Sequence, residues 1–353
     1  MDQSQLFSKR AYVFDGSDKN TDSELDLVKK IFSSLDSPIN VENIKLKEST
    51  HSYDLYKVVS KSRVYALKIS FADECRVIHR ENDILSSIEC PVTPTAITSG
   101  QIKIGENIQY SIMSHEQSDK VIELGRAILI ENFKSFCQSY KILRENEPPQ
   151  NSLSEAISDL FDLSNLENNF LETSIEAIES YSDIQKIKSL FSDIKTELAS
   201  SFDSGVLNRH DFCHGNLCID NILCRNNTFK IINFDYAHRG NVLFDLSRLI
   251  LSIGCSGNEK TQLIRKFCSE TGVEFNESEY NLCEKINLLL LLHNLAINYL
   301  YEIYMFDSAR EINICNIINE FAQNYKNFHK LRLFEKHKDF ISKTVIEPIV
   351  GNL

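Results

Sequence analysis

The chain has few cations for its size and no long uninterrupted apolar run. Its 353 residues carry a formal net charge of −12, and no strong run of lysine and arginine offsets this acidic balance. Nucleic acids and anionic membranes both require a cationic surface, so we expect neither as a general partner. The longest apolar stretch, residues 286–297, is interrupted by Asn287, His293 and Asn294. It is too short and too polar to span a bilayer, and we expect it to form a buried helix.

Signals for secretion and for structural zinc are also missing. The amino-terminal sequence MDQSQLFSKRAYVFDG has no apolar core of the length that a signal peptide needs. Ten cysteines are scattered along the chain, which is typical of reduced thiols in a cytoplasmic protein. Cys213, Cys218 and Cys224 lie close together, but their spacing matches no usual zinc pattern. We therefore expect a cytoplasmic protein whose thiols are reduced and mostly buried.

The composition is that of a globular protein whose length allows two lobes. Hydrophobic residues make up 42% and charged residues 25% of the chain. Residues 1–40 are expected to be an extension with one short helix that begins near Thr21 or Ser23. The apolar side of this helix is expected to consist of Leu25, Leu27, Val28, Ile31, Phe32 and Leu35.

Two regions of different secondary structure follow the extension. Residues 41–116 are predicted to form a small lobe in the order strand, strand, strand, helix, strand, strand, over residues 41–48, 53–60, 63–70, 73–88, 101–104 and 109–115. Residues 117–353 are predicted to be mostly helical, with helices near residues 152–161, 166–182, 184–198, 243–254, 259–271, 279–306 and 309–329. The pattern predicts an α+β fold.

The most informative stretch is residues 213–237, CHGNLCIDNILCRNNTFKIINFDYA. It reads as a polar loop with HGN at residues 214–216 and Asn221, then a β-hairpin, then a second polar loop with NFD at residues 233–235. The tripeptide FDL follows at residues 244–246. These segments in this order are rare by chance and indicate a catalytic-type loop.

This pattern resembles the aminoglycoside phosphotransferase and choline kinase family, a branch of the protein-kinase-like fold. In that family the sequence is His-Gly-Asp, four residues, Asn, and then a strand that ends in Ile-Asp-Phe or Ile-Asp-Trp. The resemblance covers residues 41–306 and implies a bilobal fold, with a small antiparallel-sheet lobe carrying one helix and a larger, mostly helical lobe. It also implies ATP and Mg²⁺ as cofactors, and an acceptor such as an amino alcohol, a sugar or an aminoglycoside.

Asparagine stands at the two positions where this family has its catalytic and its main metal-binding aspartate. These residues are Asn216 and Asn233. An amide oxygen accepts a hydrogen bond but is far too weakly basic to take up the proton of an acceptor hydroxyl. A neutral amide also supplies less charge to Mg²⁺ than a carboxylate does. Two such losses indicate a pseudokinase or redirected chemistry, such as nucleotidyl transfer through a reversed nucleotide. The alternative is slow phosphoryl transfer that depends on positioning alone.

The resemblance implies roles for other residues of the motif. His214 is expected to brace the loop rather than to act as a base. Asn221 matches the family's metal-binding asparagine. Asp235 matches an acidic position of choline-kinase-like members and would be a further metal ligand. Asp245 is expected to support the loop from beneath.

Nucleotide binding is expected to involve the small lobe. Lys68 ends the strand-like segment YALK, and Glu81 lies in the helical segment RENDIL. In the resembling family such a lysine contacts the nucleotide phosphates and such a glutamate orients the lysine. Met113 and His115 would lie at the hinge, where backbone groups read the edge of adenine.

The loop over the phosphates would consist of Ser49, Thr50 and Ser52, together with His51. It has no glycine, although glycine is what usually lets backbone N–H groups approach phosphate oxygens closely. A plain polar hairpin turn fits the same residues equally well.

The acidic balance of the chain suits a small cationic hydroxyl compound as the acceptor. Helical carboxylates that could attract it are Glu277, Glu279, Glu284, Glu302 and Asp307. A solvated helical face is the alternative for each of them. A protein partner is the other candidate, with residues 1–40 and the tail after residue 330 as docking elements.

Overall fold

The structure is a computed structural model that describes most of the chain. The described residues are 21–49, 53–61, 63–70, 76–104, 106–116, 118–148, 181–202, 204–207, 209–304, 331 and 337. The helices expected at residues 152–161 and 309–329, and nearly all of the one expected at residues 166–182, lie outside them. Two compact units are present, Met1–Ser154 with His214–His238, and Glu155–Cys213 with Arg239–Leu353.

The first unit contains a five-stranded antiparallel sheet with the strand order β1-β2-β3-β5-β4. Its strands are β1 (Val41–Ser49), β2 (Asp54–Ser60), β3 (Val64–Ser70), β4 (Ala96–Ile104) and β5 (Glu106–Ser114). Buried and half-buried side chains alternate along β2, as expected for a strand whose two faces have different surroundings. The predicted order of strands and helix is confirmed, although β4 begins five residues earlier than residue 101.

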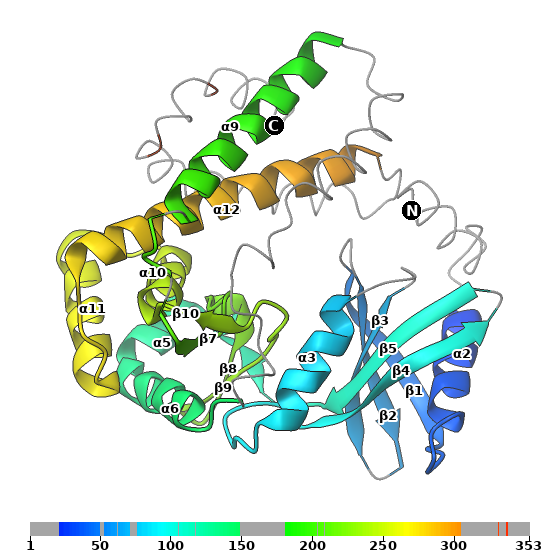
Figure 1. Ribbon diagram of the computed structural model, residues 1–353. Coiled ribbons are helices and arrows are strands. Elements are labelled where there is room, and N and C mark those ends of the chain that lie inside the picture. Colours follow the sequence, from blue (N-terminus) through cyan, green and yellow to red (C-terminus); the bar gives the residue numbers. More distant parts are fainter. Residues whose placement is uncertain are drawn as a thin grey trace. The chain divides into compact units, whose positions relative to one another are not determined.

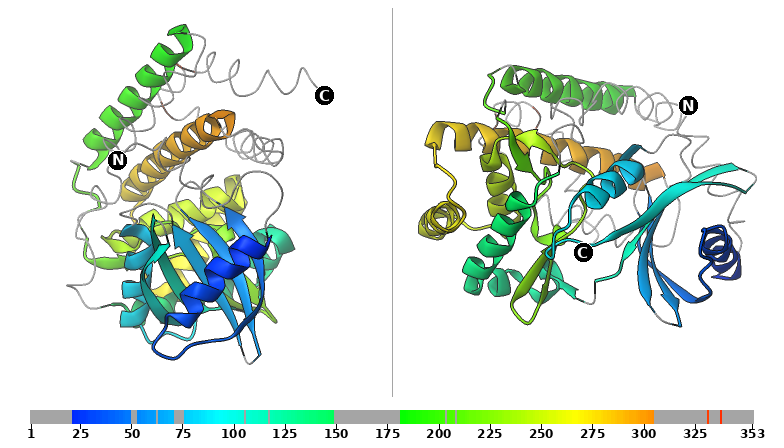
Figure 2. Two further views of the ribbon diagram at one scale, coloured as in Figure 1. Left: turned by 90° about the vertical axis from the view of Figure 1, so that its right-hand side faces the viewer. Right: turned by 60° about the horizontal axis from the view of Figure 1, so that its bottom comes forward.

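Two helices, α2 (Thr21–Ser33) and α3 (Arg76–Ser87), cover opposite faces of this sheet (Figures 1 and 2). The expected apolar side of α2 packs on one face, and the ring of Phe32 lies 5.4 Å from that of Tyr65. The buried residues of that layer are Leu27, Val28, Ile31, Phe32, Val41, Tyr56, Val58, Tyr65, Leu67, Ile69, Ile108, Tyr110 and Ile112. Because side chains alternate along β3, Lys68 follows Leu67 onto the other face, on the side of α3.

The first unit also contains the hairpin of the catalytic-type motif. Strands β8 (Ile222–Arg225) and β9 (Thr228–Ile231) pair with each other, and β6 (Asp119–Lys120) pairs with β8. The two turn residues, Asn226 and Asn227, have φ angles of 52° and 60°. Two positive φ angles are characteristic of a type I′ turn, which asparagine tolerates.

Short helices follow β6, namely α4 (Val121–Leu124), α5 (Arg126–Glu131) and α6 (Phe133–Glu145). Phe136 of α6 meets the ring of Phe229 in β9 edge-on, with ring centroids 6.0 Å apart. Helix α6 thus packs against the hairpin. The buried apolar residues of α6 recur at helical spacing, and this helix was not among those predicted from the sequence.

The second unit is mostly helical. Its elements are α9 (Tyr181–Phe202), β7 (Asp211–Cys213), α10 (Val242–Ile253), α11 (Gly257–Thr271) and α12 (Glu277–Tyr304), together with all but the first residue of β10 (His238–Gly240). Figure 1 shows α9 and α12 side by side, and Lys285 pairs with Glu197 between them at 2.9 Å. No helix among the described residues is long and apolar enough to cross a membrane.

The expected buried helix at residues 286–297 is part of α12. Asn287, which interrupts the apolar run, is almost fully buried and donates hydrogen bonds to the carbonyl of Phe244 and to Ser247 Oγ. A buried amide with satisfied partners costs little, so it does not disrupt the core. All cysteines that the structure describes are free thiols, and burial raises the pKa of Cys283 to about 12.

Candidate functional site

Lys68 lies at the centre of a polar cluster in the first unit. Strand β3 brings it to the sheet face on the side of α3, and its Nζ pairs with Glu81 Oε2 of α3 at 2.6 Å. The same Nζ donates to Asn233 Oδ1 at 2.8 Å and contacts both oxygens of Asp235, at 3.2 and 3.4 Å. Three segments that are distant in the sequence therefore meet at one ammonium group.

The segment at residues 233–235 is fixed to this cluster through its backbone as well. Glu81 accepts a hydrogen bond from the backbone N–H of Phe234 through Oε1, at 3.0 Å. Asn233 has a φ angle of 70°, in the left-handed region that asparagine occupies more readily than most residues. This local geometry presents its amide oxygen to Lys68, so one glutamate holds both the lysine and the loop.

Tyr53 also contacts the cluster. Its hydroxyl donates to Asn233 Oδ1 at 3.4 Å, and Lys68 Nζ lies 4.4 Å from the centre of its ring. Such a cation–π contact stabilises an enclosed ammonium. Nothing in the sequence marked Tyr53, because its contact depends on where β2 begins.

The charged groups in the cluster shift one another's pKa values. Burial alone lowers the pKa of Lys68, but attraction to Asp235 and Glu81 outweighs it, so the pKa lies well above the usual value. Burial raises the pKa of Asp235 to about 7, with Glu81 adding to the rise and Lys68 opposing it. The ammonium therefore stays charged, while the pKa of Asp235 lies above its ordinary value because burial outweighs the attraction of Lys68.

The catalytic-type loop is braced by His214, which is fully buried. Its Nε2 lies 2.9 Å from the carbonyl oxygen of Ile232, and its Nδ1 accepts from the backbone N–H of Asn216 at 3.2 Å. A carbonyl only accepts, so the ring is the neutral tautomer with its proton on Nε2. The ring also packs edge-on against Phe234, with centroids 4.8 Å apart. Both nitrogens hold backbone, which is the geometry of a brace rather than of a general base.

Two further residues shape this loop. Gly215 has a φ angle of 81°, and a Cβ atom added to it would overlap the carbonyl of Tyr236. Only glycine fits there without strain. Asn221 donates its side-chain N–H to the carbonyl oxygen of Asn216 at 2.8 Å. The loop therefore keeps a defined shape although residue 216 carries no carboxylate.

A cavity of about 410 Å³ opens beside the cluster, within the first unit. Volumes of this order suit small-molecule ligands. Its apolar lining comes from Leu55, Ala66, Pro94, Met113, Leu223 and Ile232. Its polar lining includes Lys47, Lys57, Lys68, Lys120, Glu81, Glu116, Asp119, Glu123, His115, Asn221 and Asn233. The sequence-predicted residues Lys68, Glu81, Met113, His115, Asn221 and Asn233 thus line one cavity.

The expected phosphate loop is largely outside the described residues. Thr50 and Ser52 lie among the residues that are not described, and Ser49 is described only as the last residue of β1. The role assigned to these three residues therefore stays a prediction.

At the hinge, the backbone N–H groups of Ser114 and His115 bond to Thr95 and Val64. Met113 and His115 line the cavity, and their contact with an adenine edge stays a prediction.

Lys47 and Lys57 are lining residues that the sequence analysis missed. Lys57 pairs in register with Ala66 of β3, and Lys47 falls at a register shift of β1 between Leu46 and Glu48. The alternation of β2 places Lys57 on the face of Lys68, and this alternation can be recognised in the sequence. The bulge that turns Lys47 toward the cavity cannot be recognised from the sequence.

The residues expected to bind Mg²⁺ do not form a ligand set that fits that ion. Asn221 and Asn233 line the cavity, but both offer only neutral amide groups. Asp235 is the one carboxylate of the three; its side chain is 3% exposed, and it is not among the residues that line the cavity. Magnesium favours anionic oxygen. Across the described ranges, no three His, Cys, Asp or Glu side chains are grouped to hold a metal.

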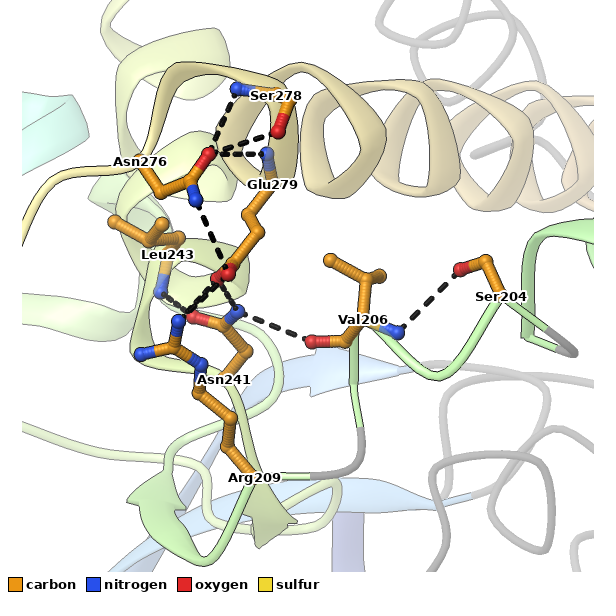
Figure 3. Close-up of polar contacts among 8 residues, drawn as sticks. All are labelled: Ser204, Val206, Arg209, Asn241, Leu243, Asn276, Ser278 and Glu279. Atoms are coloured by element: carbon orange, nitrogen blue, oxygen red, sulfur yellow. Dashed lines mark hydrogen bonds and ion pairs between the residues drawn. The ribbon is translucent and has the colours of Figure 1, made fainter.

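The carboxylates expected to attract a cationic acceptor were the helical acids of α12 and its surroundings. Figure 3 shows Glu279 of α12 between Arg209, Asn241 and Asn276. Arg209 binds it through two contacts of 2.6 and 2.7 Å, and Asn241 donates to it at 2.8 Å. Glu284 pairs with Lys260 at 2.5 Å. Both acids have partners within the second unit.

The remaining helical acids of that group are less informative. Glu277 begins α12, the side chain of Glu302 is not described, and Asp307 lies beyond the described part of the chain. Asp245, expected to support the loop, is fully buried in α10.

Solved structures of small-molecule kinases superpose on this chain. Amicoumacin kinase, solved with AMP-PNP and Ca²⁺, superposes with a TM-score of 0.57 at 11% identity, over 83% of this chain and 91% of that one. Choline kinase LicA from Streptococcus pneumoniae gives 0.51 at 14% identity, over 85% and 99%.

An aminoglycoside phosphotransferase from Streptomyces rimosus gives 0.51 at 13% identity, over 70% of this chain and 92% of that one. Neither a family model nor a curated protein sequence matches this chain. The likeness therefore lies in the fold. The chain has the bilobal, protein-kinase-like α+β fold of the aminoglycoside phosphotransferases and choline kinases.

Proposed function

We propose that this chain is a pseudokinase that binds a nucleotide such as ATP in the cavity of its first unit. In this proposal it does not transfer phosphoryl groups at ordinary kinase rates, and acts through binding or redirected chemistry. The buried Lys68–Glu81 pair beside a 410 Å³ cavity supports nucleotide binding. Proteins of the same fold have been solved with AMP-PNP or ADP.

The observation that carries the proposal is the amide at position 233. Its Oδ1 receives hydrogen bonds from Lys68 and Tyr53, at the position where the resembling family has its metal-binding aspartate. Asn216 repeats the substitution in the braced loop. Transfer of a phosphoryl group needs its charge neutralised and the acceptor hydroxyl oriented. Here the scaffold for both is present, while the two carboxylates are not.

The alternative is an atypical but active phosphotransferase that acts on an amino alcohol, a sugar or an aminoglycoside. The intact Lys68–Glu81 pair and the His214 brace favour it, because phosphoryl transfer depends mainly on positioning and electrostatics. The same fold occurs in an aminoglycoside phosphotransferase solved with ADP and streptomycin. A small cationic hydroxyl compound would be the acceptor in this case, whereas a protein partner suits the pseudokinase. We expect neither nucleic acid nor membrane as a partner, and a cytoplasmic location.

The double change Asn216→Asp with Asn233→Asp separates the two functions. If the amides are the cause, the natural chain releases no phosphate from ATP above background, and the double variant gains at least about tenfold, because a positioned base alone contributes about 10²–10⁴ in rate. Steady-state phosphate release with Mg²⁺ measures this. Asn107→Asp, an exposed change in β5, is the matched control.

Turnover by the natural chain at about 1 s⁻¹ or faster, with any defined acceptor, would disprove the pseudokinase proposal. It would establish the phosphotransferase instead. A thermal shift with ATP reports binding independently of turnover, so an inert protein that binds ATP can be told from one that does not.

A further inference from the structure

Among the described residues, the two acids that contact Lys68 offer no uncommitted anionic oxygen to a divalent cation. Asn221 and Asn233 present amides. Glu81 also lines the cavity, and its two oxygens contact Lys68 Nζ at 2.6 Å and the backbone N–H of Phe234 at 3.0 Å. A magnesium ion there would depend on the ligand's own phosphates for its charge.

Asp235 does not replace the missing carboxylate. Both of its oxygens contact Lys68 Nζ, and its side chain is 3% exposed. Two carboxylates, Glu81 and Asp235, thus surround one ammonium. An aspartate at position 233 would be a third, and the excess negative charge would call for a metal cation. With Asn233 the two carboxylates face the ammonium of Lys68, and Arg80 also lies close enough to Asp235 to interact with it.

Lysine side chains supply positive charge to the cavity. Lys47 and Lys57 line it with Lys68, and none of the residues that the structure describes forms an ion pair with either. Both lie close enough to His115 to lower its pKa, after the larger effect of burial. Glu116, Asp119 and Glu123 line the cavity as well, and Glu116 pairs with Lys230 at 2.7 Å. Because Lys47 and Lys57 have no ion pair with any described acid, an anionic ligand does not have to displace one to reach them.

We propose that the cavity binds its nucleotide without a divalent cation, with lysine side chains neutralising the phosphate charge in place of a metal ion. The inference rests on the proposed nucleotide binding and adds to it the identity of the counter-charge. Lys68 is held by Glu81 at the wall of the cavity, and Lys47 and Lys57 add positive charge on the same lining. The ligand class is a nucleotide with its polyphosphate free of metal.

The test is equilibrium binding of AMP-PNP to the full chain, by titration calorimetry, in excess Mg²⁺ and in EDTA. We expect dissociation constants that agree within about threefold. Tightening by Mg²⁺ of about tenfold or more would overturn the metal-free inference and leave nucleotide binding intact. Absence of binding in both conditions would overturn the proposed function itself, and this inference with it.

Three variants identify the source of the counter-charge. Asn233→Asp restores a cavity-facing carboxylate, and we expect Mg²⁺ to tighten its binding by about tenfold. Lys47→Ala with Lys57→Ala should weaken binding in EDTA by at least about fivefold. Lys103→Ala removes an exposed lysine of β4 that does not line the cavity and should change nothing. An unchanged affinity in the Lys47/Lys57 variant, or an Mg²⁺ response in Asn233→Asp no larger than in the natural chain, would contradict the proposal.

Discussion

The ammonium group of Lys68 contacts oxygens of Glu81, Asn233 and Asp235, and the side chains of Lys68, Glu81 and Asp235 are buried. Charges are costly to bury unless they are paired and hydrogen-bonded. This cluster meets that condition internally, because one cation faces two carboxylates and an amide oxygen. The amide at position 233 is therefore compatible with a stable fold.

Replacing Lys68 by methionine should destabilise the fold strongly. It would leave Glu81 and Asp235 buried beside each other without a cation, and breaking a buried pair from one side costs about 3–5 kcal/mol. Urea unfolding followed by circular dichroism measures the free energy of unfolding. Lys103→Met, at an exposed position of β4, is the control and should change it by less than about 0.5 kcal/mol. A loss below about 1 kcal/mol for Lys68→Met would show that the cluster is not the buried network described.

His115 should make the stability depend on pH. Burial, together with Lys57 and Lys47, lowers its pKa in the folded state below the unfolded value of 6.5. The folded state then binds fewer protons than the unfolded one, so the stability from this residue is present above about pH 6.5 and lost as pH falls through the folded pKa. His115→Gln should flatten the pH dependence between about pH 5 and 7 in urea titrations. Exposed His210→Gln is the comparison, and equal slopes in the two variants would contradict the assignment.

At the scale of elements, the loop at residues 214–221 depends on its glycine. Gly215 has a positive φ angle, and a Cβ atom there would overlap the carbonyl of Tyr236. Gly215→Ala should therefore destabilise the fold by about 2 kcal/mol or more. Thermal unfolding measures this, with Gly125→Ala as the control. Gly125 also has a positive φ angle but nothing within 4 Å of an added Cβ, so equal losses would rule out the overlap as the cause.

The start of α12 is held by a polar network (Figure 3). Removing one of its side chains should lower the free energy of unfolding by less than Gly215→Ala does. Asn276 Oδ1 accepts from the backbone N–H groups of Ser278 and Glu279, which is helix capping. Asn276→Ala should lower the free energy of unfolding by about 1 kcal/mol. Glu279→Gln should cost up to about 1 kcal/mol, since Arg209 is partly exposed. If Glu279→Gln left stability unchanged but abolished binding of a cationic acceptor, Glu279 would be a substrate residue instead.

The elements with a strong period were predictable from the sequence. The apolar side of α2, the alternation of β2 and the hairpin at residues 222–231 have local patterns, and the structure has these elements within a few residues. Helix α6 has the same kind of pattern and was overlooked. Strand β6 has only two residues, which is too short for any period to appear.

The site was predictable to the extent that the resemblance covered it. Lys68, Glu81, Asn233 and Asp235 were named from the motifs, and the structure brings them into one cluster. Tyr53 and Lys47 were not named, because their positions depend on the strand start and on a register shift rather than on residue type. The enclosure of Asp235 behind its contacts with Lys68 is likewise a consequence of packing, which no local pattern encodes.

At the scale of the whole molecule, the chain combines a kinase-like fold with asparagine at positions 216 and 233, where the resemblance implies aspartate. Braces and ion pairs that shape the loop are present, including those of His214 and Glu81. Stability and shape depend on these interactions, whereas turnover also requires a base and a metal. A protein that binds a nucleotide and keeps it intact needs the bracing interactions but neither the base nor the metal.

The most direct measurement of this claim is phosphorus NMR of ATP held by stoichiometric full-length protein in excess Mg²⁺. A panel of amino alcohols, sugars and aminoglycosides is added as acceptors, and Asn216→Asp with Asn233→Asp is measured in parallel. The expected result is that ATP binds to the natural chain and its three phosphorus signals persist for hours, while the double variant converts ATP to ADP. Conversion by the natural chain within seconds, as expected of a kinase that turns over at about 1–100 s⁻¹, would contradict it.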